Sequence, residues 1–262
     1  TDTGDTPIWE PAPETTPLWD EVCLTGLFPV DIDTQALLGV VALLPLAAEP
    51  QLKGLPDQVW ERAWMDRFKP MRFGQSLWII PSGSEAPEPE GLLLHLDPGV
   101  AFGTGTHATT HLCLEWIDSL AANGGFAGKD VLDFGCGSGV LGIATALAGA
   151  RRVHCLDYDP QAVWASGENA RRNGVNDQLS AAEAASPAGF DGDIVIANIL
   201  AGILERLAPE LVAAVRPGGQ LVLTGILEEQ ADSVQVAYAR AGLRIMPAAA
   251  REGWVRMEGN RE

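Results

Sequence analysis

The 262-residue chain is long enough for one full domain and a smaller one, and 47% of its residues are hydrophobic. With 35 acidic against 17 basic residues, its net charge of −18 disfavours a nucleic-acid partner and fits a basic partner, simple solubility or a saline habitat. No stretch reaches the roughly 18 unbroken apolar residues of a membrane span. The four cysteines form no C-x-x-C pair, so neither zinc nor a disulfide framework is expected, and a reducing, cytoplasmic setting fits best.

The first 53 residues are rich in proline and predict only part of a small domain. One helix is expected in this part, over residues 34–44. Apolar residues recur at helical spacing over 56–68, which predicts a second helix. This second helix would connect two domains, and its tryptophans would serve packing.

Strands and helices alternate regularly from residue 92 onward. Strands are predicted over 92–96, 130–134, 153–157, 193–197 and 220–224, with a weaker one near Leu179. Helices are predicted over 109–120, 139–148, 160–173, 200–215 and 228–241. Two final strands, 243–246 and 254–257, are expected to pair antiparallel. This alternation predicts an α/β fold with a mostly parallel sheet and helices on both faces.

The strand and glycine-rich turn at 131–139 are the most informative segment. Residues 137–142 fit the G-x-G-x-x-G pattern of a dinucleotide fold, with an acid about 20 residues further on. A turn starting there would bury Asp133 inside a strand covered on both faces. A turn starting at Gly135 places Asp133 near the strand tip, where it can meet a ligand amine or organise the loop. The second register favours a sulfonium nucleoside; a dinucleotide, or a turn needed only for packing, is the alternative.

Two polar residues end neighbouring predicted strands. Asp157 is placed to accept both ribose hydroxyls of a nucleoside, whereas Asp159 is better suited to the N-terminus of the next helix. Asn198 faces the same edge of the sheet. It is expected to hold either the nucleophile or a methionine moiety; the alternative is that it caps the following helix.

The segment 101–110 carries two glycines at a spacing of two, followed by hydroxyl groups and an imidazole at a helix N-terminus. This pattern predicts a mobile loop that covers a carboxylate-bearing ligand. Thr110 is expected to contact the ligand directly. His107 is expected to shape the acceptor side, with a purely structural role as the alternative.

Residues 97–107 and 133–139 together resemble the bacterial methyltransferases of large-subunit ribosomal protein eleven, the PrmA type. The segments 156–160 and 198–201 carry the same likeness, which extends over nearly the whole chain. The resemblance implies a Rossmann-like, S-adenosylmethionine-dependent methyltransferase fold with a mostly parallel seven-stranded sheet. It also implies three parts: a small α/β substrate-recognition domain lacking its first portion (1–53), a helical linker (54–70) and the catalytic domain (71–262).

The resemblance also assigns site residues. S-adenosylmethionine is the implied methyl donor, and the family's contacts to it fall on Thr110, Gly135, Asp157 and Asn198. Further donor contacts are expected from Phe102, Gly103, Thr104, Asp133 and Gly137. Asn198 and His107 are the catalytic candidates, and no metal is implied. The expected partner is basic ribosomal protein eleven, trimethylated on lysine side chains and its N-terminal amine, with no nucleic acid or membrane involved. Another protein, a small-molecule amine, or a nicotinamide-dependent oxidoreductase or other nucleotide-binding module is the alternative.

Overall fold

The computed structural model describes residues 22–54, 68–97, 103 and 105–262. The chain divides into two compact units, Thr1–Trp60 and Glu61–Glu262. The boundary falls inside the segment 54–70 that was expected to link two domains. The helix predicted over 56–68 lies, except for its last residue, outside the described residues.

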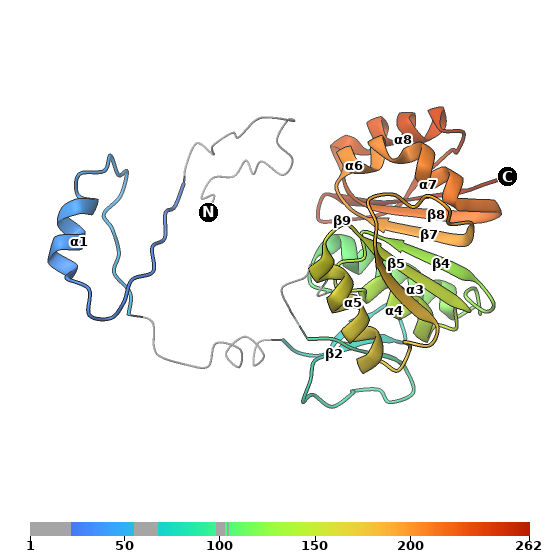
Figure 1. Ribbon diagram of the computed structural model, residues 1–262, viewed down its shortest axis with the longest axis horizontal. Helices are drawn as coiled ribbons and strands as arrows, with labels where there is room; N and C mark the ends of the chain where they lie inside the picture. Colours follow the sequence, from blue (N-terminus) through green and yellow to red (C-terminus); the bar gives the residue numbers. More distant parts are fainter. Residues whose placement is uncertain (1–21, 55–67, 98–102, 104) are drawn as a thin grey trace. The chain divides into compact units, whose positions relative to one another are not determined.

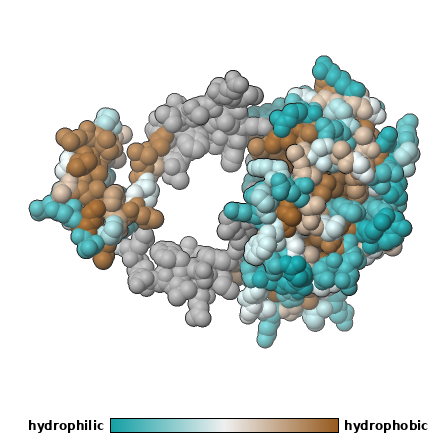
Figure 2. Space-filling model, viewed as in Figure 1, coloured by the Kyte–Doolittle hydropathy of each residue, from teal (hydrophilic) through white to brown (hydrophobic). Residues whose placement is uncertain are grey.

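The first unit contains the short helix α1 (Thr34–Val41), which ends three residues earlier than predicted. The Asp33 carboxylate caps it by accepting hydrogen bonds from the backbone N–H groups of Gln35 (3.0 Å) and Ala36 (3.1 Å). No residue of α1 is buried. Large apolar side chains on either side of the helix are also exposed, and Figure 2 shows them as brown patches over this part of the chain.

The second unit is built on a seven-stranded sheet with the order β6-β5-β4-β7-β8-β10-β9. Its strands are β4 (Asp130–Phe134), β5 (Arg152–Asp157), β6 (Leu179–Glu183), β7 (Gly192–Asn198), β8 (Val215–Leu227), β9 (Met246–Arg251) and β10 (Trp254–Asn260). The strands from β6 to β8 pair in parallel, and β10 pairs antiparallel with both β8 and β9. The predicted mostly parallel sheet is confirmed, and the carboxyl ends of β5, β4 and β7 lie side by side.

Helices cover both faces of this sheet (Figure 1). One core forms beneath α3 (Ala108–Ala121), α4 (Val140–Leu147) and α5 (Pro160–Arg172). The other forms beneath α6 (Ala201–Arg206), α7 (Ala208–Ala214) and α8 (Ala231–Arg240). Neighbouring residues of β4 point into different cores, Val131 into the first and Leu132 into the second, so the strand is buried on both faces. None of the helices that the structure describes is both long and apolar enough to cross a membrane.

The prediction of a single helix over 200–215 is wrong. The structure divides this segment into α6 and α7, with a break at Leu207. The cause is Pro209, which has no N–H group to donate to the carbonyl of Glu205 and therefore interrupts the helical hydrogen bonds.

Three other boundaries differ from the prediction. The strand expected at 220–224 begins at Val215, because the glycine turn before it forms a bulge within β8. The helix expected over 228–241 consists of a 3₁₀ turn (Glu228–Gln230) followed by α8. The strand expected at 243–246 lies at Met246–Arg251, although its antiparallel pairing with β10 is confirmed.

A separate three-stranded sheet contains β1 (Met71–Phe73), β2 (Leu77–Ile80) and β3 (Leu92–His95), of which only β3 was predicted. It packs into the same core as α3 and α4. The buried Asp118 carboxylate on α3 fixes the β1–β2 turn by accepting from the backbone N–H groups of Gln75 (2.6 Å) and Ser76 (2.9 Å).

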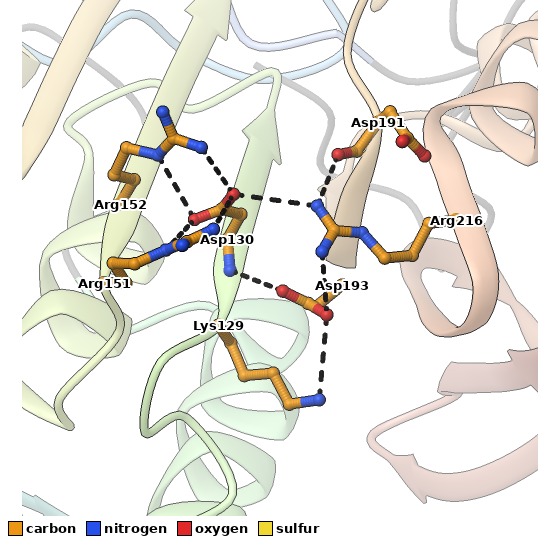
Figure 3. Close-up of polar contacts among 7 residues, drawn as sticks. All are labelled: Lys129, Asp130, Arg151, Arg152, Asp191, Asp193 and Arg216. Atoms are coloured by element: carbon orange, nitrogen blue, oxygen red, sulfur yellow. Dashed lines mark hydrogen bonds and ion pairs between the residues drawn. The ribbon is translucent and has the colours of Figure 1, made fainter.

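A charge network fixes the amino ends of the central strands (Figure 3). The buried Asp130 carboxylate at the start of β4 meets the guanidinium groups of Arg151 (2.6 Å), Arg152 (2.8 Å) and Arg216 (3.6 Å). Hydrogen bonds from Arg152 and Arg151 hold the pKa of Asp130 well below its usual value. Asp193 on β7 joins the network by accepting from the Asp130 backbone N–H (2.8 Å). The network ties β4, β5, β7 and β8 together at the edge opposite the predicted site.

Candidate functional site

The glycine-rich turn starts where β4 ends, at Gly135, as the second register predicted. Gly135, Gly137 and Gly139 all have positive φ angles, of 73°, 54° and 79°. A Cβ atom on Gly135 would lie 2.2 Å from Cγ2 of Ile199, which follows β7. The turn therefore needs glycine at this position both for its backbone conformation and for its contact with the neighbouring strand end.

Asp133 lies inside β4 with 1% of its surface exposed. Its Oδ2 atom accepts a hydrogen bond from the backbone N–H of Gly142 in the first turn of α4 (2.8 Å). Burial raises the pKa of this carboxyl group to about 7, the hydrogen bond lowers it, and the nearby Asp157 raises it further. Because the helix cap itself is Gly139, which has no side chain to offer, Asp133 supplies an acceptor that the helix start otherwise lacks. Of its two predicted roles, this contact corresponds to the organisation of the loop.

Asp157 at the end of β5 is joined directly to the glycine turn. Its Oδ2 accepts from the Gly137 backbone N–H (2.9 Å) and its Oδ1 from that of Asp159 (3.0 Å). Only 8% of Asp157 is exposed. Asp159 caps α5 by accepting from the N–H of Gln161 (2.8 Å), as predicted. Asp157 is thus held in one orientation beside the turn, with further lone pairs on both oxygens.

Thr110 and Asn198 are brought together although 88 residues separate them. The Asn198 side-chain amide donates to the hydroxyl of Thr110 over 3.4 Å, which is a long hydrogen bond. Thr110 is fully buried in the first turn of α3, and Asn198 is the last residue of β7, next to β4. The capping alternative for Asn198 is wrong, because Leu200 holds the cap position of α6.

His107 is the N-cap of α3. Its Nδ1 atom lies 2.7 Å from the Thr109 hydroxyl and accepts from the Thr109 backbone N–H (3.3 Å). The ring packs edge-on against Trp254, with 5.0 Å between ring centroids. Burial lowers the pKa of His107, which the Glu252 carboxylate opposes. These contacts give His107 a structural task at the start of the helix that carries Thr110.

The loop before α3 reaches the glycine turn through Gly103, which has a φ of 104°. The buried Ser138 hydroxyl donates to the Gly103 carbonyl (2.7 Å), so the expected covering loop and the turn touch at this point. Phe102 and Thr104, the other two loop residues predicted to contact the ligand, lie outside the described residues.

Sequence reasoning missed three polar side chains that hold the turn: Ser138 itself, and Ser166 and Asn169 on α5. All three bond to backbone carbonyl groups, so no motif records them. The one available signal was the recurrence of small residues every fourth position along α5, which permits a close helix contact.

The complete site therefore brings backbone amides, a fixed carboxylate and a neutral amide–hydroxyl pair to one edge of the sheet. Such an edge suits a nucleoside ligand in an open α/β fold. The contacts of Asp133 and Asp157 described above all come from backbone N–H groups. The carboxylate of Asp157 therefore makes the site negative in character, which favours a cationic ligand over a pyrophosphate.

A model of the ribosomal protein L11 methyltransferase (PrmA) family matches residues 1–262. The ribosomal protein L11 methyltransferase of Methylococcus capsulatus is 50% identical over 265 residues, covering 99% of this chain and 88% of the relative. Its counterpart in Pseudomonas aeruginosa is 51% identical over the same shares of both chains.

Solved structures show the same likeness. The ribosomal protein L11 methylase of Lactobacillus delbrueckii subsp. bulgaricus superposes with a TM-score of 0.64 at 28% identity, covering 74% of this chain and 100% of that one. A 16S rRNA methyltransferase of T. thermophilus, determined with AdoMet and guanosine, gives a TM-score of 0.53 at 20% identity, covering 62% of this chain and 45% of that one. The second similarity concerns the fold alone.

Proposed function

Because the chain belongs to the ribosomal protein L11 methyltransferase family, we propose that it transfers methyl groups from S-adenosylmethionine to lysine side-chain amines and the N-terminal amine of ribosomal protein L11. One observation supports this most directly. Three strand ends and the first turn of α3 gather the glycine turn, Asp157 and the Thr110–Asn198 pair at a single edge of the sheet.

The residues present fit the donor. Gly135 has no Cβ and a φ of 73°, so the turn packs closely against Ile199 after β7 and would present its backbone to the donor. The Asp157 carboxylate, already oriented by two backbone N–H groups, would accept the ribose hydroxyls with its remaining lone pairs. Thr110 and Asn198 would hold the amino-acid part. The further contacts proposed for the donor are Phe102, Gly103, Thr104, Asp133 and Gly137.

When bound, the donor supplies a methyl group already activated on a sulfonium sulfur, so the protein's task is mainly alignment and exclusion of water. A free lysine has a pKa of about 10.4, so only about one in 2,500 is neutral at pH 7. We propose that the Asn198 amide accepts an N–H from the neutral amine and orients its lone pair. His107 would border the acceptor side; because burial lowers its pKa, it adds little positive charge to repel the amine.

The parts of the chain divide this work. We propose that residues 1–53 recognise the substrate, 54–70 link the two units, and 71–262 carry out methyl transfer. The net charge of −18 would draw a basic ribosomal protein toward the enzyme. The reaction needs neither nucleic acid nor membrane, and its setting would be the cytoplasm.

Two measurements test the proposal. Calorimetry with S-adenosylmethionine and with NAD should show binding of the first alone, and that binding should weaken strongly in Asp157→Ala. Incubation of purified ribosomal protein L11 with donor labelled in its methyl group should place label on lysine residues and the N-terminus. A chain that binds NAD instead, or that leaves the ribosomal protein unlabelled while labelling a small amine, would contradict it.

A further inference from the structure

Two side chains of α5 hold the carbonyl groups of the glycine turn. The Ser166 hydroxyl donates to the Gly137 carbonyl (3.0 Å), and the Asn169 side-chain amide donates to the Ser138 carbonyl (2.9 Å). Ser166 and Asn169 are three positions apart, so they lie on the same face of the helix. Ser166 is fully buried, so its hydroxyl has no access to solvent and is satisfied within the protein.

Small residues bring α5 close enough for these bonds. The buried positions of the helix are Ala162, Ser166 and Ala170, spaced by four. A Cβ on Gly139 would lie 2.9 Å from the Ser166 hydroxyl oxygen and 3.1 Å from its Cα atom. Neither the turn nor the helix has room for larger side chains at this contact, so the sequence encodes a close approach between them.

Gly137 carries the effect of α5 to the donor site. Its carbonyl accepts from Ser166, and its N–H donates to the Asp157 carboxylate (2.9 Å). The peptide after Gly137 is planar and trans, so fixing its carbonyl fixes the direction of the Ser138 N–H. The Gly137 N–H that bonds to Asp157 lies on the other side of the same Cα atom, so α5 and Asp157 hold Gly137 from both sides. The Ser138 carbonyl, held by Asn169, shares its peptide with the Gly139 N–H, which donates to the Cys136 carbonyl (2.8 Å) and closes the turn.

We propose that Ser166 and Asn169 are positioning residues of the donor site, which fix the glycine turn and, through Gly137, the carboxylate of Asp157. This inference rests on the proposed function, since it assigns these residues to the binding of S-adenosylmethionine. They act through the backbone and do not touch the donor themselves.

The test compares two variants with a control on the same helix. Asn169→Asp keeps the shape of the side chain but removes its N–H donor, and Ser166→Ala removes the hydroxyl. The control is Asn173→Ala, because Asn173 also bonds to backbone groups outside the turn, namely the N–H (2.7 Å) and carbonyl (2.8 Å) of His95 and the carbonyl of Asn169 (2.8 Å). Thermal unfolding of each variant sets a temperature at which all are folded.

Calorimetry at that temperature should give a dissociation constant for S-adenosylmethionine about three- to tenfold higher in Asn169→Asp and Ser166→Ala, as expected for the loss of one hydrogen bond. Asn173→Ala should lower thermal stability and leave this constant unchanged, and the KM for the ribosomal protein should not change in any variant. If the wild-type chain binds the donor, two results would overturn the inference. One is unchanged donor affinity in both Ser166→Ala and Asn169→Asp, and the other is an equal loss of affinity in Asn173→Ala. Absence of donor binding in the wild type would instead overturn the proposed function, and the inference with it.

Discussion

The buried carboxyl group of Asp133 should make the protein less stable as the pH rises through neutrality. Burial raises its pKa to about 7 in the folded chain, whereas an aspartate in an unfolded chain has a pKa of about 3.9. Between these values the folded state holds a proton that the unfolded state has released. The free energy of unfolding therefore falls by about 1.4 kcal/mol per pH unit over this range.

The magnitude follows from the two pKa values. The stability is fully present below about pH 4 and is lost as the pH passes about 7, a total of about 4 kcal/mol, of which about 2.5 kcal/mol is lost between pH 5 and pH 8. The side chain introduced by Asp133→Asn stays neutral at every pH, and its amide oxygen can still accept from the Gly142 N–H. Its unpartnered amide N–H groups impose a cost of about 1–3 kcal/mol that does not depend on pH.

The assay is urea unfolding followed by the fluorescence of the eight tryptophans, for both proteins, at several pH values from 5 to 8. All other titrating groups are common to both chains, so the difference between their unfolding free energies isolates Asp133. That difference should shift in favour of Asp133→Asn by about 2.5 kcal/mol across the range. A difference that stays constant from pH 5 to pH 8 would show that the carboxyl group does not titrate there, and would refute the reasoning.

Three further predictions concern the two edges of the sheet. Asp130→Asn should destabilise the protein at neutral pH because three arginines lose their shared carboxylate. The pKa of Asp130 is lowered in the folded state, so the wild type loses this stabilisation as the pH falls below about 4. Urea titrations should therefore show the difference in unfolding free energy between the two proteins shrinking in that range. Gly135→Ala should weaken donor binding at least tenfold by calorimetry, because its Cβ would meet Ile199 at 2.2 Å and its φ is 73°; Gly149→Ala, which meets nothing within 4 Å at a φ of 97°, is the control for backbone strain alone. Asp157→Asn should weaken binding of the cationic donor more than that of its uncharged thioether product, and equal weakening of both would contradict an electrostatic role.

The parts of the fold that could be predicted are those in which one local signal determines the structure. The apolar residues of β4 and β7 predict strands that are buried on both faces, and Pro160 together with Gly174 sets the limits of α5. The three residues of β1 cannot establish a period, and β2 was missed although β3, which has the same four-residue length, was predicted. Pro209 was a signal for the break in the predicted 200–215 helix. The apolar residues keep their helical spacing through the break, so the sequence pattern predicted one continuous helix.

The site could be predicted only as far as strand ends define it. Parallel strands place their last residues at one edge, which is why Asp157 and Asn198 were found from sequence. The contact between Asn198 and Thr110 depends on where α3 crosses the sheet, and the bonds from Ser166 and Asn169 end on backbone atoms that every residue possesses. The small residues of α5 indicate a close helix contact, but they do not identify the backbone carbonyl groups to which Ser166 and Asn169 bond.

Carboxylates serve opposite purposes at the two edges of the same sheet. At the amino edge, Asp130 is surrounded by three guanidinium groups, and its charge is neutralised within the protein. At the carboxyl edge, Asp157 accepts only from backbone N–H groups in the contacts described here, so its negative charge remains available to a ligand. A sulfonium donor is positive at sulfur until its methyl group is transferred and uncharged there afterwards. The field of Asp157 therefore attracts the substrate form of the ligand and not the product form, so methyl transfer itself weakens the attraction of the spent donor to the site.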